Sequence, residues 1–185
     1  MKIVIFGDSI TNGYDHVDHS SSLLLKEAVE KVAQHEVEVI LQGVNGENTA
    51  DALKRVGKVL AEQADKVLVF FGANDAANHV PVTPEQFHAN LTRIVQQIGT
   101  DKAVLLTPPY HNDDCGVDKR SNRFVERFGA ETKAVAEQFN LPLIDIYQAM
   151  RASEQANAWL QADGFHISTF GYEQLGQVIV KALGL

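Results

Sequence analysis

The stretch Ile3-Val4-Ile5-Phe6-Gly7-Asp8-Ser9 opens the chain with an apolar run that ends in a tight polar turn. A continuous apolar run is typical of a strand that is covered on both faces, as in a parallel sheet. Four further runs of this kind follow: Val37 to Leu41, Val67 to Phe71, Ala103 to Thr107 and Leu143 to Ile146. We therefore expect five strands that form one parallel sheet.

Segments with apolar residues at helical spacing separate these runs. The expected helices cover Ser22 to Gln34, Thr49 to Ala64, Glu85 to Ile98, Asn122 to Asn140 and Gly171 to Leu183. The third helix follows Thr83 and Pro84, a pair that favours a helix start. In the first two helices, the spacing assigns Val32 and Leu60 to the buried face. Strands that alternate with helices predict a doubly wound α/β sandwich.

Composition limits the classes of protein to consider. The 185 residues are 45% hydrophobic and 22% charged, which is an ordinary balance for one domain that spans residues 1–185. The net charge of -8 argues against a nucleic-acid or anionic-membrane partner, because both attract basic surfaces. The single Cys115 can form no internal disulfide, and the first apolar run is too short for a signal peptide or a membrane span. We expect a cytoplasmic protein without membrane insertion.

Three irregular segments begin where expected strands end: Ile10 to Ser20, Asn74 to Thr83 and Pro108 to Arg120. Ligands of open parallel sheets bind beyond the carboxyl ends of the strands. A fourth irregular segment, Ala156 to Thr169, precedes the last helix. We expect these four loops to surround one site.

Ser9 is the candidate nucleophile, because a turn directly after a strand can expose its hydroxyl group. A serine is a weak nucleophile and needs a general base. In one alternative, Ser9 only caps the turn. In another, the loop up to Gly13 holds a phosphate, as in a flavodoxin-like nucleotide or FMN-binding module. Asp8 argues against a phosphate site, because its carboxylate would repel the ligand.

His166 is the best candidate for the base. Asp163 lies three residues before it, so a turn or a first helical turn would point both side chains the same way. The carboxylate could then accept from one ring nitrogen, fix the tautomer and leave the other nitrogen for Ser9. The alternative is a solvated pair in a loop, because this spacing is common by chance.

Gly46 and Asn74 are candidates for an oxyanion hole. Gly46 follows the second expected strand, where a residue without a side chain allows its N–H to come close to a substrate. Asn74 follows the third and offers an uncharged amide donor. As alternatives, Gly46 is an ordinary turn residue and Asn74 bonds to its own loop.

Several polar clusters favour simpler interpretations. The histidines and carboxylates from Asp15 to His19 have spacing typical of metal ligands, but a solvated loop explains them better. The segment from His111 to Cys115 is interpreted as a polar loop over the site rather than a zinc or thiol centre. Asp75 has no histidine nearby in the sequence, so we expect it to stabilise its own loop. We expect no metal and no cofactor.

The four polar blocks, taken together and in order, resemble those of the SGNH hydrolases, also called GDSL esterases and lipases. The resemblance covers nearly the whole chain and rests on Gly7 to Ile10, Gly43 to Gly46, Gly72 to Asp75 and Asp163 to His166. It implies a flavodoxin-like three-layer α/β/α sandwich with a five-stranded parallel sheet. It also implies metal-independent ester hydrolysis through an acyl-enzyme.

The resemblance assigns a role to each block residue. Ser9 would be the nucleophile, with Asp163 and His166 as the other catalytic residues. The N–H of Ser9, the N–H of Gly46 and the side chain of Asn74 would form the oxyanion hole. The substrate would be a small-molecule ester, and the oligomeric state is left open.

A narrower resemblance points to the isoamyl acetate-hydrolysing esterase branch, which favours small acyl esters. It rests on Phe70 to Ala76, His79 to Pro81 and Thr107 to Pro109. His79 and Phe165 are the candidate substrate contacts. The same site could instead serve a carbohydrate acetylesterase, a thioesterase or a lysophospholipase.

Overall fold

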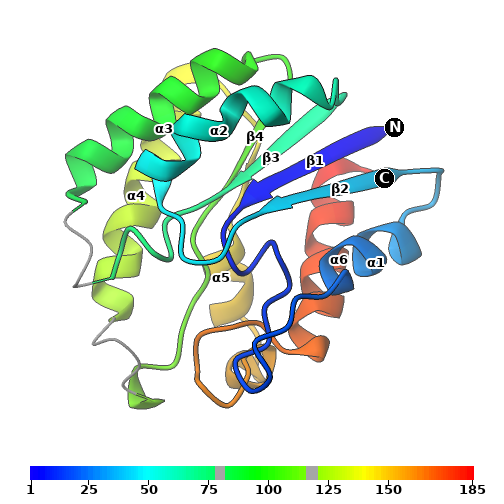
Figure 1. Ribbon diagram of the computed structural model, residues 1–185. Helices are drawn as coiled ribbons and strands as arrows, with labels where there is room; N and C mark the ends of the chain where they lie inside the picture. The colour runs from blue at the N-terminus through cyan, green and yellow to red at the C-terminus, as the bar shows by residue number, and fades with distance from the viewer. Residues whose placement is uncertain (78–81, 116–120) are drawn as a thin grey trace.

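The computed structural model describes residues 1–77, 82–115 and 121–185. At its centre lies a five-stranded sheet in the order β2-β1-β3-β4-β5, in which all neighbouring strands are parallel (Figure 1). The strands are β1 Lys2–Gly7, β2 Glu38–Gly43, β3 Lys66–Phe70, β4 Ala103–Leu106 and β5 Leu143–Ile144. The expected parallel sheet is therefore confirmed.

Helices cover both faces of this sheet, as the three-layer prediction requires. They are α1 Leu24–Val32, α2 Thr49–Ala61, α3 Pro84–Ile98, α4 Asn122–Phe139, α5 Ile146–Arg151 and α6 Thr169–Leu183, with short 3-10 turns η1 Asp113–Cys115 and η3 Ala156–Trp159. α1 and α6 pack together on one face, and α2, α3 and α4 lie on the other (Figure 1). In the described part of the chain, no helix combines the length and apolar composition that a membrane span needs.

The alternation of side chains along β1 explains why its apolar run is continuous. Ile3 and Ile5 belong to the core on the side of α1 and α6, whereas Val4 and Phe6 belong to the core on the side of α2, α3 and α4. All four side chains are fully buried. A strand that is covered on both faces has no polar face, so its alternation is invisible in the sequence.

Side-chain caps fix where two helices begin. Thr83 accepts from the N–H of Gln86, and the Gln86 side chain accepts from the N–H of Thr83, with Pro84 at the first helical position of α3. This confirms the expected start of that helix. The hydroxyl of Ser168 accepts from the N–H of Gly171 at 3.0 Å, so α6 begins before Gly171.

Some details of the sequence prediction are wrong. β5 ends at Ile144, because the Asp145 carboxylate accepts from the N–H of Gln148 and begins the unexpected helix α5. Leu60 is 44% exposed: the buried stripe of α2 runs through Val56 and Val59, and the next position is rotated away from the sheet. Val32, the last residue of α1, is 38% exposed.

Candidate active site

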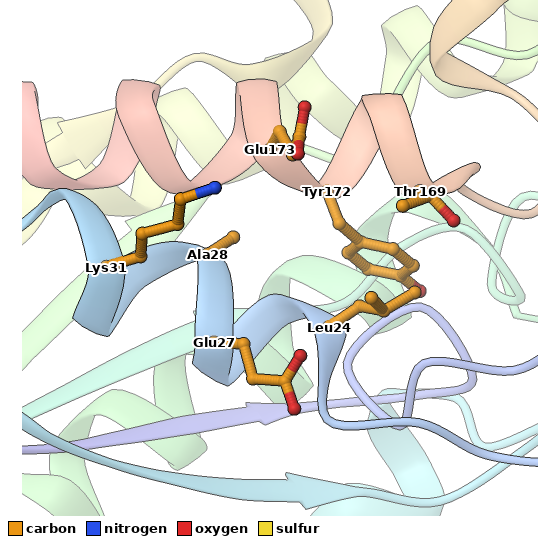
Figure 2. A pocket seen from close by; sticks show the side chains of 7 residues that line it. All are labelled: Leu24, Glu27, Ala28, Lys31, Thr169, Tyr172 and Glu173. Carbon is orange, nitrogen blue, oxygen red and sulfur yellow. The ribbon is translucent and has the colours of Figure 1, made fainter.

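Ser9 lies in a tight turn at the carboxyl end of β1. The N–H of Asn12 donates to the carbonyl of Asp8 at 3.0 Å, and the N–H of Tyr14 donates to the carbonyl of Ser9 at 3.1 Å. Figure 2 shows Tyr172 on α6. Its hydroxyl donates to the carbonyl of Ile10 at 2.8 Å. Main-chain and buried side-chain contacts therefore hold the nucleophile candidate in place.

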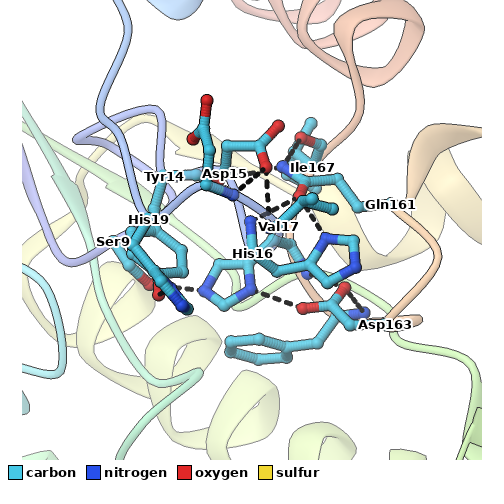
Figure 3. Close-up of polar contacts among 12 residues, drawn as sticks. Ser9, Tyr14, Asp15, His16, Val17, His19, Gln161, Asp163 and Ile167 are labelled. Atoms are coloured by element: carbon cyan, nitrogen blue, oxygen red, sulfur yellow. Dashed lines mark hydrogen bonds and ion pairs between the residues drawn. The ribbon is translucent and has the colours of Figure 1, made fainter.

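The structure brings Ser9, His166 and Asp163 into one hydrogen-bonded chain. Figure 3 labels Ser9 and Asp163, the two ends of this chain. Ser9 Oγ lies 3.2 Å from His166 Nε2, and His166 Nδ1 lies 2.6 Å from Asp163 Oδ2. The other carboxylate oxygen, Oδ1, accepts from the N–H groups of Phe165 and His166, each at 3.0 Å. The turn that contains both residues thus fixes the orientation of the carboxylate.

The charge of Asp163 determines which tautomer the neutral imidazole of His166 adopts, namely the one with its proton on Nδ1. Burial opposes ionisation of Asp163, but hydrogen bonds from the His166 ring and from two main-chain amides outweigh it and lower the pKa of the carboxyl group to about 2. Asp163 is therefore charged at neutral pH and accepts the Nδ1 proton. His166 Nε2 is left with its lone pair toward the Ser9 hydroxyl, which is the geometry of a general base.

Two aromatic rings pack against the imidazole of His166. The rings of Tyr14 and Phe165 each have their centroid 4.7 Å from that of His166, with interplanar angles of 52° and 78°. Phe165 is only 5% exposed and also belongs to the core on the side of α1 and α6. Its contact with substrate stays a prediction, and His79 lies outside the described residues.

Asn74 joins the ends of three strands. Its side-chain Nδ2 donates to the carbonyl of Glu47 at 2.9 Å and to Asp8 Oδ2 at 3.3 Å. Glu47 directly follows Gly46 and Asp8 directly precedes Ser9, so the three oxyanion candidates come together. Within residues 1–77, 82–115 and 121–185, the N–H groups of Ser9 and Gly46 have no hydrogen-bond acceptor and are available as donors.

Gly46 is required by its backbone conformation. Its φ of +79° lies in the left-handed region, which residues with a Cβ adopt only at a cost. A Cβ built on Gly46 would have no atom of the described structure within 4 Å. The described residues therefore leave the space on the Cβ side of Gly46 unfilled.

Arg55 of α2 supports the same loops from below and was not identified from the sequence. Its guanidinium donates to the carbonyls of Gly7 at 2.7 Å and Gln42 at 3.0 Å, and it pairs with the Glu47 carboxylate. The group also lies 4.6 Å from the centre of the Phe6 ring, and the Arg55 side chain is 10% exposed. One side chain thus ties the ends of β1 and β2 to the loop that follows β2.

Asp75 holds the loop after β3, as expected from the sequence. Its carboxylate accepts from the N–H of Thr49 at 3.0 Å and from the Thr49 hydroxyl at 2.6 Å. Asn90 of α3 donates to the same hydroxyl at 3.1 Å. Burial raises the pKa of Asp75 to about 6, although the hydrogen bonds from Thr49 act in the opposite direction.

The segments with metal-like spacing serve as structured loops. His16 Nδ1 lies 2.7 Å from the side-chain oxygen of Gln161, and His19 Nδ1 lies 2.5 Å from the Tyr14 hydroxyl, so the two imidazoles have different partners. Among the residues that the structure describes, no group of three or more histidine, cysteine or acidic side chains could hold a metal ion.

The polar loop after β4 contacts the turn of Asp163 and His166. The N–H of Asn112 donates to the carbonyl of Gly164 at 2.8 Å. A Cβ on Gly164 would lie 2.6 Å from the sulfur of Cys115, so the two segments pack closely. The described part of this loop therefore borders the candidate site, as predicted.

Polar side chains of the loop from Asn12 to Ser21 are hydrogen-bonded to other groups of the protein. The Asn12 amide donates to the Ser21 hydroxyl at 2.7 Å and to the Asn45 side-chain oxygen at 2.9 Å. The neighbouring Asp8 carboxylate, which accepts from the N–H of Ile10, adds negative charge. This arrangement argues against the phosphate-binding alternative.

Comparisons with known proteins identify the family of the chain. The model of the GDSL-like lipase/acylhydrolase family matches residues 5–174. A GDSL esterase/lipase of Arabidopsis thaliana is 27% identical over 213 aligned positions, which cover 98% of this chain and 85% of that protein.

Solved structures share the fold. The crystal structure of the lipase/acylhydrolase from Enterococcus faecalis has a TM-score of 0.91 and 40% identity, over 98% of this chain and 94% of that one. An acetylxylan esterase from Geobacillus stearothermophilus has a TM-score of 0.75 and 22% identity, over 100% of this chain and 94% of that one. At this lower identity the similarity concerns the fold alone.

Proposed function

The chain belongs to the GDSL-like lipase/acylhydrolase family and is a carboxylic ester hydrolase, and from this premise we propose that it cleaves short acyl esters through an acyl-enzyme on Ser9. One observation carries the proposal. It is the continuous hydrogen-bond chain from Asp163 through His166 to the Ser9 hydroxyl, with contacts of 2.6 and 3.2 Å.

The acylation step follows from this geometry. His166 Nε2 takes the proton of the Ser9 hydroxyl while Oγ forms a bond to the ester carbonyl carbon. The negative charge of Asp163 stabilises the resulting imidazolium. When the tetrahedral intermediate collapses, the bond to the alcohol oxygen breaks, and His166 gives its proton to the departing alcohol.

Deacylation repeats these steps with water as the nucleophile. His166 Nε2 takes a proton from water, whose oxygen attacks the acyl carbon on Ser9. Breaking of the acyl bond returns the proton from His166 to Ser9 Oγ and releases the acid. One base thus serves both halves of the reaction.

The oxyanion would be bound by three donors: the N–H groups of Ser9 and Gly46, and the side chain of Asn74. The two main-chain N–H groups support this role, because neither donates to another described group. Asn74 Nδ2 already contacts the Glu47 carbonyl and, at the longer distance of 3.3 Å, Asp8. We expect the N–H that faces Asp8 to turn toward the oxyanion when charge develops on the substrate.

Preference for a small acyl group is supported by the similarity of the segment from Phe70 to Ala76 to the isoamyl acetate-hydrolysing branch. A carbohydrate acetylesterase is the second candidate, because the acetylxylan esterase noted above shares the fold and the exposed His19 offers a polar group near Tyr14. These substrate classes are distinguished by measuring hydrolysis rates on a panel of substrates. The panel contains p-nitrophenyl esters from acetyl to decanoyl, acetylated sugars, a thioester and a lysophospholipid.

Replacement of the nucleophile tests the proposal directly. We expect Ser9→Ala to lose hydrolysis of p-nitrophenyl acetate by several orders of magnitude while the far-UV circular dichroism and melting temperature stay close to those of the parent. Ser121→Ala is the matched control, since Ser121 precedes α4 without a capping side-chain bond. Full activity of the Ser9 variant would overturn the acyl-enzyme.

A further inference from the structure

We propose that Gln161 is a positioning residue that holds the catalytic base in register with the nucleophile. This inference rests on the proposed function of Ser9 and His166. The two residues are 157 positions apart in the sequence, and their contact depends on how two loops meet. We call these the Ser9 loop, residues 8–20, and the His166 turn, residues 161–167.

The main chain of Gln161 closes the His166 turn. Its N–H donates to the carbonyl of His166 at 2.7 Å, and its carbonyl accepts from the N–H of Gly164 at 2.9 Å. The flanking residues Leu160 and Ile167 form an antiparallel bridge at the base of the turn. The Gln161 backbone is therefore rigidly connected to Asp163 and His166.

The side chain of Gln161 connects this turn to the Ser9 loop (Figure 3). Its oxygen lies 3.0 Å from the donating N–H nitrogen of His16 and 2.7 Å from His16 Nδ1. Its nitrogen donates to the carbonyls of Tyr14 at 2.8 Å and Ile167 at 2.9 Å. Three of these four bonds reach the Ser9 loop, and the fourth returns to the His166 turn.

Only a carboxamide group satisfies all four of these hydrogen-bond partners. Two acceptor sites and two donor hydrogens are needed at one point, and a primary amide supplies both. A glutamate of the same shape would place an oxygen against the carbonyls of Tyr14 and Ile167. A methionine would fill the space and satisfy none of the four groups.

The Ser9 loop transmits this connection to the nucleophile. Tyr14, whose carbonyl accepts from Gln161, donates its own N–H to the carbonyl of Ser9 at 3.1 Å. The Tyr14 ring also packs against the His166 imidazole. These contacts hold Ser9 Oγ and His166 Nε2 at their distance of 3.2 Å. Displacing a reacting group by about 1 Å can lower a rate on the order of 100-fold.

The test is the variant Gln161→Met, with Gln161→Glu as a second variant of nearly the same shape and Gln138→Met as the control. Gln138 also accepts from a histidine, His88, but it lies on α4, outside the Ser9 loop and the His166 turn. With p-nitrophenyl acetate, we expect each Gln161 variant to lower kcat about 10- to 100-fold and KM to change less than about threefold. Parental kcat in a folded Gln161 variant overturns the proposal.

A double-mutant cycle distinguishes positioning from a general structural role. If Gln161 acts through His166, adding Gln161→Met to His166→Ala changes the residual rate by less than about twofold. An equal loss in both backgrounds overturns the proposal. A third readout is the downfield proton signal of His166 Nδ1–H, which should persist in Gln161→Met because Asp163 and His166 share one turn. Loss of that signal would mean that the turn itself has collapsed, and it also overturns the proposal.

The same experiments separate this inference from the proposed function. Full activity of Ser9→Ala contradicts the acyl-enzyme, whatever Gln161 does. Loss of activity in the Ser9 and His166 variants, combined with parental kcat in the Gln161 variants, supports the acyl-enzyme and removes only the positioning role. If neither Gln161 variant folds, the residue serves the fold as a whole and the proposal fails.

Discussion

The orientation of the Asp163 carboxylate predicts that Asp163→Asn forces His166 into the wrong tautomer. In the parent, Oδ1 accepts from the N–H groups of Phe165 and His166, and Oδ2 faces His166 Nδ1. The two main-chain donors need an acceptor, so an asparagine places its oxygen there and turns its NH₂ group toward Nδ1. Because Nδ1 must then accept, the imidazole proton moves to Nε2, which faces Ser9.

The expected loss follows from what His166 can then no longer do. With a proton on Nε2, the imidazole cannot take the Ser9 proton, and no carboxylate stabilises an imidazolium. Removing both contributions lowers kcat by about 10⁴, or about 5 kcal/mol of transition-state stabilisation. Asp163 has a pKa of about 2, so the parent retains its carboxylate across the assay range and the comparison holds from weakly acidic to alkaline pH.

We expect Asp163→Ala to be more active than Asp163→Asn but less stable. Alanine imposes no tautomer, so part of the population keeps a basic Nε2, and kcat should exceed that of the asparagine variant. The same change removes the carboxylate oxygen that accepts from the N–H groups of Phe165 and His166, at a cost of about 1–3 kcal/mol for each N–H that stays buried. The alanine variant should therefore unfold at lower urea concentration than the asparagine variant.

Steady-state hydrolysis of p-nitrophenyl acetate and urea unfolding, both measured on all three proteins, check these two rankings. Exposed Asp114→Asn, in the loop after β4, serves as the control for the loss of one carboxylate. If Asp163→Asn is as active as Asp163→Ala, the tautomer argument is wrong. If it retains more than about a tenth of the parental kcat, Asp163 does not orient the base.

Three further predictions concern the loops around the site. Asn74→Ala should lower kcat by about 10² to 10³ with little change in KM, and an unchanged kcat would remove Asn74 from the oxyanion hole. Arg55→Lys keeps the charge but loses the fork that joins the carbonyls of Gly7 and Gln42. It should lower both kcat and the affinity for a boronic-acid inhibitor about tenfold, and parental inhibitor affinity would contradict this. The pKa of Asp75 is raised from 3.8 to about 6, so its protonated form favours folding, and the parent should lose up to about 3 kcal/mol relative to Asp75→Asn as the pH rises through this window. Urea unfolding at several pH values measures the difference, and parallel curves for the two proteins would refute it.

The features that could be predicted from the sequence are local ones. The strands β1, β3 and β4 follow from apolar runs, and the turn of Asp163 and His166 follows from their three-residue spacing. The predicted last strand is longer than β5, because the run from Leu143 to Ile146 includes Asp145. An acidic residue just before Ile146 is also a helix-cap signal, and it could have indicated α5.

The roles of Gln161 and Arg55 could not be predicted, because most of their partners are main-chain groups. Every residue has a main-chain carbonyl, so no sequence pattern indicates that those of Gly7, Tyr14 and Ile167 accept these hydrogen bonds. Arg55 reads as an ordinary basic residue of an amphipathic helix, and Gln161 as a polar loop residue. Their importance comes from the number of backbone groups that each one satisfies at once, which depends on tertiary structure.

These two residues explain how the site can keep its geometry while its substrate preference varies. Arg55 supports the loops that carry the proposed oxyanion donors, and Gln161, as proposed above, aligns His166 with Ser9. Both bond mainly to backbone, so exchanging exposed side chains such as Val17 or His19 leaves those bonds in place. The exposed loop side chains are then free to select the acyl group and alcohol, while the chemistry depends on a framework that they do not touch.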